Sequence, residues 1–398
     1  MRFKILLCLC FMLLQSCTVP PPEGPAKTDH VERVPLREIP GFDDDLNRES
    51  LKTAVERSLS FYDRIPGDRT FSLGDMKIRA EVLKASLLEF LKLMEANRLD
   101  RDSVAKVFHV YRVGSPSENG DPALITGYYE PILDGRLVQD EEFCYPLYGV
   151  PSDQLTIHPA DFDAGRSSEE RYIGRLEGSR VVPYFTRAEI DGDRKLSQSV
   201  QCLVWLKDPI EAFFLHIQGS GIVRLPAGRL ARVGYAGSNG RPYRSIGKYL
   251  LEKGVISREE MSLQAIRDYL RTHSDVQNEI MWYNKSYVFF RWVDQGPVGS
   301  LNVVLTAGRS VATDVRYYPR GALGFLRTEK PRLDTNGQVT GWEPLNRWVL
   351  NQDTGGAIKG SSRVDLFCGS GETAEWMAGR LKHPGKIYFL VKKEKNGD

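Results

Sequence analysis

Residues 348–368 read WVLNQDTGGAIKGSSRVDLFC, two β-rich runs separated by a glycine-rich turn. The apolar residues of 348–351 and 363–368 predict two strands. Asp353 opens the turn, and Asp365 lies within the second run. Carboxyl groups between apolar strand residues and glycine-rich turns tend to lie near a desolvated rim, where the pKa rises and the group can hold a proton near neutral pH. This stretch therefore predicts β-structure that carries acid–base chemistry.

A third aspartate has a similar setting. Asp314 ends the segment VATD, five residues before Pro319. The alternative for each aspartate is a side chain that only caps the backbone of its own turn. That alternative is weakest for Asp365, so Asp365 is the first candidate for catalysis.

The rest of the chain is also rich in short β-type runs, broken by glycine and proline. Further strands are predicted at residues 124–129, 203–206, 213–217, 287–292, 301–306 and 386–391. Helices are predicted from a cap at Ser50 to about residue 63, and over 73–96, 245–254 and 257–272. Strands and helices do not alternate regularly, which argues against a doubly wound parallel sheet. The pattern predicts a mainly β fold with peripheral helices, in the form of a barrel.

Length and composition indicate a globular protein of enzyme size. A chain of 398 residues with 41% hydrophobic and 27% charged residues has room for two or three folding units. The net charge of +2 favours no nucleic-acid partner. Six cysteines are too few for a disulfide scaffold, and Cys144, Cys202 and Cys368 are expected to be buried free thiols.

The first residues indicate where the protein resides. A short basic start precedes an apolar run at 5–14, which is too short to span a bilayer and is typical of a signal peptide. The sequence LQSC at 14–17 resembles the lipobox of bacterial lipoproteins, in which Cys17 would be acylated; the alternative is an ordinary cleaved signal. The resemblance to bacterial lipoproteins implies the outer membrane, because Thr18 stands where aspartate would otherwise be expected. The proline-rich residues 20–25 would act as a spacer.

Two short motifs match those of dinucleotide-binding proteins and aspartic proteases, but the surrounding sequence that such proteins need is missing. Residues 369–374, GSGETA, have the letters of a dinucleotide fingerprint, yet too little chain follows for a βαβ unit. The triplet DTG at 353–355 matches an aspartic protease, which needs two such carboxylates sharing a proton, and the chain has one triplet. Without C-x-x-C or H-x-x-H spacing, a structural zinc site is not expected.

Several segments together resemble the family of MltA-type lytic murein transglycosylases, whose C-terminal part is called the 3D domain after three aspartates. The matching segments are TGYYEP (126–131), PYFTRAEI (183–190), IQGSG (217–221), GYAG (234–237), YRSIGK (243–248) and the three aspartate segments. They follow the family's order over about residues 50–392. One departure is Glu130, where some relatives carry a neutral polar residue.

The resemblance implies a double-psi β-barrel built from both ends of the chain, a second β-domain inserted after the Tyr-Tyr motif, and a glycan groove between them. The domain boundaries that it implies are 1–16 for the signal peptide, 17–45 for the lipidated spacer, 46–130 and 296–392 for the barrel, and 131–295 for the insert. In the family, the aspartate at the position of Asp365 is the sole catalytic carboxylate. Asp353 and Asp314 are expected to support it, and no metal or cofactor is expected.

A glycan site needs aromatic surface for sugar faces, and amide or hydroxyl groups for sugar hydroxyls. Glycines beside such residues permit close approach of the backbone. The predicted substrate-binding residues are Thr126, Gly127, Tyr129, Gln218, Ser220, Gly221 and Gly356. Of the adjacent tyrosines, Tyr129 rather than Tyr128 is expected to face the sugar.

The predicted function is a lytic transglycosylase that cleaves the β-1,4 bond between N-acetylmuramic acid and N-acetylglucosamine and leaves 1,6-anhydromuramic acid ends. Two alternatives are a non-catalytic peptidoglycan-binding lipoprotein and a two-carboxylate, muramidase-like hydrolase. The expected partners are peptidoglycan glycan strands, outer-membrane lipid at Cys17 and, by family analogy, a cell-wall synthase complex. The expected location is the periplasmic face of the outer membrane.

Overall fold

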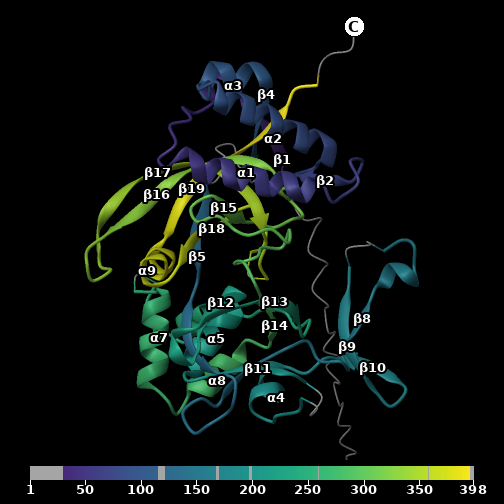
Figure 1. Ribbon diagram of the computed structural model, residues 1–398, viewed down its shortest axis with the longest axis vertical. Helices are drawn as coiled ribbons and strands as arrows, with labels where there is room; N and C mark the ends of the chain where they lie inside the picture. Colours follow the sequence, from purple (N-terminus) through teal and green to yellow (C-terminus); the bar gives the residue numbers. More distant parts are fainter. Residues whose placement is uncertain are drawn as a thin grey trace, which may run out of the picture.

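The computed structural model describes residues 30–114, 122–166, 170–196, 200–258, 260–356 and 358–394. The expected signal peptide and Cys17 lie outside these residues. Figure 1 shows two halves: a barrel with helices at its upper end, and a lower half built from the middle of the chain.

The upper half contains a closed six-stranded β-barrel. Its strands run in the order β19-β16-β17-β15-β18-β5, and β5 pairs back onto β19 to close the ring. The pairs β15–β17 and β18–β5 are parallel, whereas the other pairs are antiparallel. The strands are β5 Ala123–Glu130, β15 Ser310–Ala312, β16 Leu323–Leu333, β17 Val339–Asp353, β18 Arg363–Ser370 and β19 Lys382–Lys392. The mainly β, double-psi barrel class predicted from the sequence is confirmed.

Further strands and helices complete the upper half. β4 (Phe108–Gly114) pairs with β19, and β1 (His30–Arg33) pairs with β4 at the sheet edge. The helices are α1 Arg48–Tyr62, α2 Ala80–Glu95, α3 Arg101–Val107 and α9 Glu372–Arg380, with a one-turn helix at Leu36–Glu38. Together with the barrel strands, α1, α2 and α3 enclose the largest hydrophobic core.

The lower half is a second β-domain with its own sheets. One sheet has the order β14-β13-β12-β6-β11-β7, and a small one has the order β10-β9-β8. Its strands are β6 Ile132–Arg136, β7 Tyr145–Tyr148, β8 Leu155–Ile157, β9 Tyr172–Glu177, β10 Arg180–Pro183, β11 Cys202–Leu206, β12 Ser220–Arg224, β13 Leu230–Ser238 and β14 Val288–Val293. Its helices are α4 Arg187–Asp191, α5 Pro209–Gln218, α6 Ile246–Glu252, α7 Leu263–Thr272 and α8 Gln277–Tyr283, with one-turn helices at Pro159–Asp161 and Pro226–Gly228.

Two expectations about the N-terminal helices are wrong. Asn47, not Ser50, caps α1, because its side chain accepts the Ser50 N–H. The first residues of the expected helix at 73–96 belong instead to the hairpin of β2 (Thr70–Leu73) and β3 (Met76–Arg79). Gly74 turns this hairpin with a φ of 56°, a conformation that favours glycine.

Two of the expected strands are also wrong. Residues 213–217 lie in α5, which Asp208 caps and Pro209 opens. Its buried residues lie on more than one face, and such a helix cannot be distinguished from a buried strand by periodicity. Residues 301–306 form no strand, and only Val304 makes an isolated bridge. Leu301, Val303 and Leu305 are nevertheless buried, which explains the alternation in the sequence.

The three described cysteines are free thiols, as expected, but each is half-buried rather than fully buried. Burial raises the pKa of Cys202 to about 11 and that of Cys368 to about 12. Both groups are therefore neutral thiols at physiological pH.

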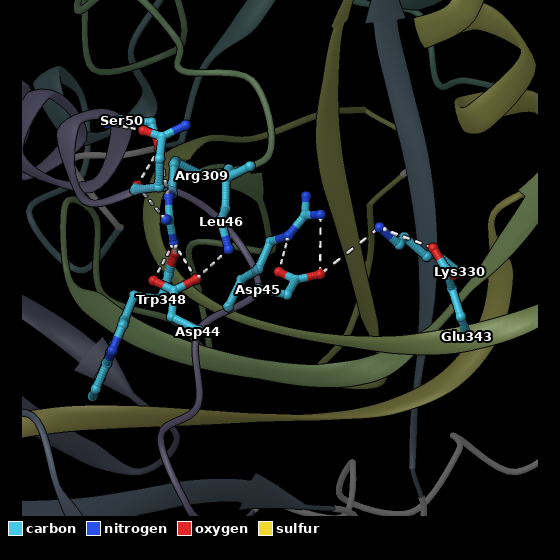
Figure 2. Close-up of polar contacts among 10 residues, drawn as sticks. Asp44, Asp45, Leu46, Ser50, Arg309, Lys330, Glu343 and Trp348 are labelled. Carbon is cyan, nitrogen blue, oxygen red and sulfur yellow. Dashed lines mark hydrogen bonds and ion pairs between the residues drawn. The ribbon is translucent and has the colours of Figure 1, made fainter.

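A buried arginine fixes the N-terminal segment to the barrel beside β15 (Figure 2). The Arg309 side chain is fully buried and forms an ion pair with Asp44, at 2.7 Å. It also donates to the Ser50 hydroxyl and to the backbone oxygen of Trp348, on β17. Because Arg309 directly precedes β15, these contacts hold the start of that strand in place.

A second buried arginine joins the two halves. Arg267, on α7, donates to the Tyr129 hydroxyl on β5 at 2.8 Å and to Glu211 on α5 at 3.0 Å. It also contacts Glu375 on α9. Figure 1 shows α7 directly below α9. Breaking such a buried network would leave uncompensated charges, so it resists separation of the two halves.

The chain crosses between the halves immediately after β5. Glu130 is fully buried there, and its carboxyl accepts from the Ser370 hydroxyl at 2.6 Å and lies 3.4 Å from Arg232 of β13. Burial raises its pKa. Glu130, the residue at which the chain departs from some relatives, is thus buried where the chain passes from the barrel to the lower half.

Candidate active site

A single row across four barrel strands carries the polar residues of the site. Asp365 of β18 pairs with Thr126 of β5 on one side and with Ala312 of β15 on the other. Ala312 in turn pairs with Asp353, the last residue of β17. Residues opposite one another in a sheet point to the same face, so both carboxyl groups flank the small Ala312 side chain. At about 4.8 Å per strand, the Cα atoms of the two aspartates lie about 10 Å apart.

Asp365 is largely buried and is held by two side chains. The Thr126 hydroxyl donates to Oδ1. The Arg363 guanidinium donates from Nε to Oδ1 at 3.1 Å and from Nη2 to Oδ2 at 3.3 Å. The Asp365 side chain is 11% exposed and that of Arg363 is 35% exposed, so the ion pair lies at the surface of the barrel.

Asp353 has a different environment. Its Oδ1 accepts the backbone N–H groups of Ser300 and Thr354, each at 2.9 Å, and its Oδ2 accepts the Tyr128 hydroxyl at 3.0 Å. Burial raises the pKa of Asp353 to about 6, although these three donors oppose the rise and the charge of Asp365 adds to it. Both oxygens are therefore already engaged within the protein.

Asp314 lies just beyond β15 and contacts the far end of the glycine-rich turn. It accepts the Gly360 N–H at 2.8 Å and forms an ion pair with Arg316 at 2.5 Å. Burial would raise the pKa of Asp314, but the hydrogen bonds from Arg316 and from the Gly360 N–H outweigh it and lower that pKa. Asp314 is thus an ionised group that ties down the turn between Asp353 and Asp365.

The expectation that Tyr129 rather than Tyr128 faces the sugar is wrong. Tyr129 is 2% exposed and its hydroxyl is bound to Arg267. Tyr128 is half-buried, packs against Phe367 at 5.3 Å between ring centroids and reaches Asp353. Because side chains alternate along β5, Tyr128 shares the face of Thr126.

The two glycines predicted for substrate binding serve close packing. A Cβ on Gly127 would lie 2.8 Å from the Cα of Ala378, so the glycine lets α9 pack against β5. A Cβ on Gly221 would lie 2.5 Å from Leu215, and Gly221 is buried. Gly221 is therefore away from the surface, whereas Gly127 is half-buried beneath α9.

The other predicted residues lie near the boundary of the halves. Gln218 ends α5 and accepts the Tyr129 N–H at 3.2 Å, and the half-buried Ser220 follows it at the start of β12. Gly356 is exposed, and a Cβ there would lie 3.9 Å from Tyr243. Tyr243 comes from the lower half, so the glycine-rich turn of the barrel meets the second domain there.

Sequence reasoning assigned no role to Arg363 or Tyr243. The signal for Arg363 was present, since residues two apart on a strand share a face and Arg363 precedes Asp365 by two. Tyr243 lies close enough to Arg363 and Asp365 for their charges to affect its pKa, which burial raises. Its proximity depends on the packing of two domains and has no local signal.

Within the described ranges, no group of three or more histidine, cysteine, aspartate or glutamate side chains is arranged to hold a metal ion. The same residues include no helix that is long and apolar enough to cross a membrane.

Comparison with known proteins agrees with this architecture. Residues 124–291 match the model of the MltA specific insert domain, and residues 309–391 match that of the 3D domain. The fold and the row of carboxyl groups therefore define a 3D-domain barrel that carries an MltA-type insert.

The relatives have a common description. Membrane-bound lytic murein transglycosylase A of Escherichia coli K12 is 34% identical over 277 residues, which are 69% of this chain and 67% of the relative. The crystal structure of a membrane-bound lytic murein transglycosylase from Agrobacterium tumefaciens superposes with a TM-score of 0.75 at 27% identity, over 91% of this chain and 97% of that one. E. coli MltA with bound chitohexaose gives a TM-score of 0.67 at 26% identity, over 92% and 96%. This chain belongs to the MltA family of lytic murein transglycosylases.

Proposed function

We propose that the chain is a lytic transglycosylase that cleaves the β-1,4 bond between N-acetylmuramic acid and N-acetylglucosamine in peptidoglycan. The main support is the position of Asp365, which lies near the surface of the barrel in reach of Thr126 and Arg363. The structure of E. coli MltA with chitohexaose shows that a relative binds a glycan of N-acetylglucosamine type.

Asp365 would act first as a general acid. It donates a proton to the glycosidic oxygen, and the N-acetylglucosamine end leaves. The C6 hydroxyl of the same muramic acid then attacks the oxocarbenium-like centre, and the ionised Asp365 removes the hydroxyl proton. The intramolecular attack has a large effective molarity, and no water is consumed. The product is a 1,6-anhydromuramic acid end.

A hydrolase would need a second catalytic carboxyl group beside Asp365, and Asp353 is the candidate for that role. An inverting hydrolase requires carboxyl groups ~6.5–9.5 Å apart, and a retaining one requires ~5–5.5 Å. Both oxygens of Asp353 accept hydrogen bonds from Ser300, Thr354 and Tyr128. This engagement favours a supporting role for Asp353 and a single working carboxyl at Asp365. Asp314 would support the same site through the glycine-rich turn.

Product analysis tests this proposal. Purified sacculi are digested with the protein, and the soluble muropeptides are examined by mass spectrometry before and after borohydride treatment. We expect anhydro ends, one water lighter than hydrolysis products and not reduced by borohydride. Reducing muramic acid ends would instead identify a hydrolase, and sacculus binding without soluble products would identify a binding protein.

Lipid anchoring is a separate proposal. Acylation of Cys17 would hold the protein at the periplasmic face of the outer membrane, because two or three acyl chains anchor stably where one does not. Cys17→Ala should move the protein from the membrane fraction to the soluble periplasm, and an unchanged distribution would disprove it. A cell-wall synthase partner is proposed on family analogy alone.

A further inference from the structure

A cavity with a volume of about 470 Å³ lies at the upper end of the barrel, where α3 and β4 contribute to its walls (Figure 1). Small-molecule sites commonly have volumes of ~300–1,000 Å³. β19 runs from this cavity to the candidate active site. Its residue Lys392 pairs with Phe108, which lines the cavity, and its residue Lys382 pairs with Thr126. This length of strand spans about 30 Å, so the cavity is separate from the row of carboxyl groups.

The cavity has an excess of positive charge. Its lining includes the cations Arg33, Lys106 and Lys393 and one carboxylate, that of Asp102. Within the described ranges, none of the three cations forms an ion pair with a carboxylate. Lys393 donates to the backbone oxygen of Ala105 at 2.6 Å, and the side chains of Arg33 and Lys106 are exposed. The cations are therefore available to an anion from outside the chain.

His109 adds a hydrogen-bonding atom to the same cavity. Its ring is part of the lining, and its Nδ1 is buried without a hydrogen-bond partner among the described residues. Burial lowers the pKa of His109, and the charges of Arg33 and Lys393 lower it further, so the ring is neutral at neutral pH. A neutral imidazole with its proton on Nδ1 can donate to a ligand oxygen. Cations around such a donor suit a phosphate group, which is anionic and has several acceptor oxygens.

The cavity also has an apolar side. Leu36 belongs to the lining and is 58% exposed. Behind it lie the buried residues Val34, Ile39 and Phe108. An inorganic phosphate ion has no apolar part to place against Leu36, whereas a phospholipid carries its acyl chains next to its phosphate. The combination of cations and exposed apolar surface therefore favours a lipid headgroup over a free ion.

The course of the chain favours the same ligand. Residues 18–29 separate Cys17 from His30, the first residue of β1, and this stretch spans at most about 45 Å when fully extended. Arg33 ends β1 and lines the cavity. Acylation of Cys17 would therefore keep β1 and the cavity near a lipid surface.

We propose that this cavity binds the phosphate headgroup of an anionic phospholipid through Arg33, Lys106 and Lys393. The choice of a lipid rests on the proposed anchoring at Cys17, but the site itself is independent of catalysis. Bound in this way, the barrel has a second attachment to the membrane, and the row of carboxyl groups is held about 30 Å from the cavity, at the end of the barrel remote from the lipid.

Vesicle sedimentation tests the site without the anchor. The mature chain with Cys17→Ala, which carries no acyl chains, should sediment with vesicles that contain phosphatidylglycerol and not with vesicles of phosphatidylcholine alone. Arg33→Gln combined with Lys106→Gln should weaken this binding about tenfold or more. Lys386→Gln removes an exposed cation of β19 outside the cavity and should change binding less than about twofold. Equal binding by the double variant and the parent protein would overturn the proposal.

Ala105→Leu tests the cavity rather than its charge. Ala105 belongs to the lining, and a larger side chain there would fill part of the volume without changing a charge. We expect binding to phosphatidylglycerol vesicles to weaken about fivefold or more. Binding at the parent level would show that the lipid is attracted by the basic surface alone, which contradicts a headgroup in the cavity. Circular dichroism and unchanged muropeptide release verify that the variants are folded.

Titration calorimetry with inorganic phosphate distinguishes the two sources of a phosphate group. We expect no measurable binding of inorganic phosphate at lipid-phosphate concentrations that saturate vesicle binding. Binding of the free ion that the double variant loses, without binding to vesicles, would replace the lipid by a soluble anion and overturn the proposal. Because these measurements use unacylated protein, they can fail while the anchoring at Cys17 stands.

Discussion

Asp353 and Asp365 pair with the same residue, Ala312, from opposite sides of β15. The two carboxyl groups therefore share one face of the barrel, yet one is bound by backbone N–H groups and a phenol and the other by an arginine and a threonine. This difference predicts different roles for two chemically identical side chains.

Asp365→Asn should lower the turnover of sacculi by at least ~10², because it keeps the shape and removes the proton. Asp353→Asn should lower this turnover by a smaller factor, since an asparagine oxygen can still accept a hydrogen bond from the backbone N–H of Ser300 or Thr354. Muropeptide release measures both, and circular dichroism verifies folding. Two folded variants with equally low activity would require a two-carboxylate scheme.

The stability of the protein should depend on Asp353 in the acidic range. A carboxyl group with a folded pKa of about 6 binds a proton more tightly than the unfolded chain, whose aspartate pKa is about 3.9. Its contribution to the free energy of unfolding is therefore most favourable below pH 4 and falls as pH rises to 6, by at most about 3 kcal/mol. Urea unfolding at pH 4 to 7 should show a smaller decline for Asp353→Asn. Parallel curves would contradict the raised pKa.

Gly127→Ala should destabilise the protein by about 1–3 kcal/mol, because the new Cβ would overlap the backbone of α9 at Ala378. Gly356→Ala is the matched control, since its nearest neighbour is 3.9 Å away and the expected change is within about 0.5 kcal/mol. Thermal unfolding compares the two variants. A neutral Gly127→Ala would show that α9 can move freely.

Removal of the buried Arg309 guanidinium, shown in Figure 2, should lower the free energy of unfolding. Arg309→Met leaves the Asp44 carboxylate, which is 16% exposed, without its partner, and should destabilise by about 3–5 kcal/mol. Lys330→Met removes the more exposed contacts with Asp45 and Glu343 and should cost at most about 1 kcal/mol. Equal losses in denaturant unfolding would show that burial of Arg309 has no special effect.

The sequence predicted the β-rich class, the barrel and the candidate aspartates, because strand runs and glycine-rich turns leave local signals. It did not predict the row of Thr126, Asp365, Ala312 and Asp353, because their alignment depends on the register of strands far apart in the chain. Thr126 and Asp365, for example, are 239 residues apart. The helix at 213–217 was misassigned because its apolar residues are buried on several sides. The orientation of Tyr129 follows from Arg267, a residue of the other domain.

The edge position of β1 has a mechanical consequence. β1 pairs with β4 alone and lies outside the closed ring of six strands that carries the carboxyl groups. A pulling force on residues before His30, such as a lipid anchor would transmit, reaches the folded protein at this strand. Where that force pulls His30 away from Gly114, its partner on β4, the hydrogen bonds of the pair open one after another, so β1 would separate before the load reached β19. The four-residue strand β1 would then detach first, and the barrel strands around Asp365 would keep their geometry while the tether is under tension.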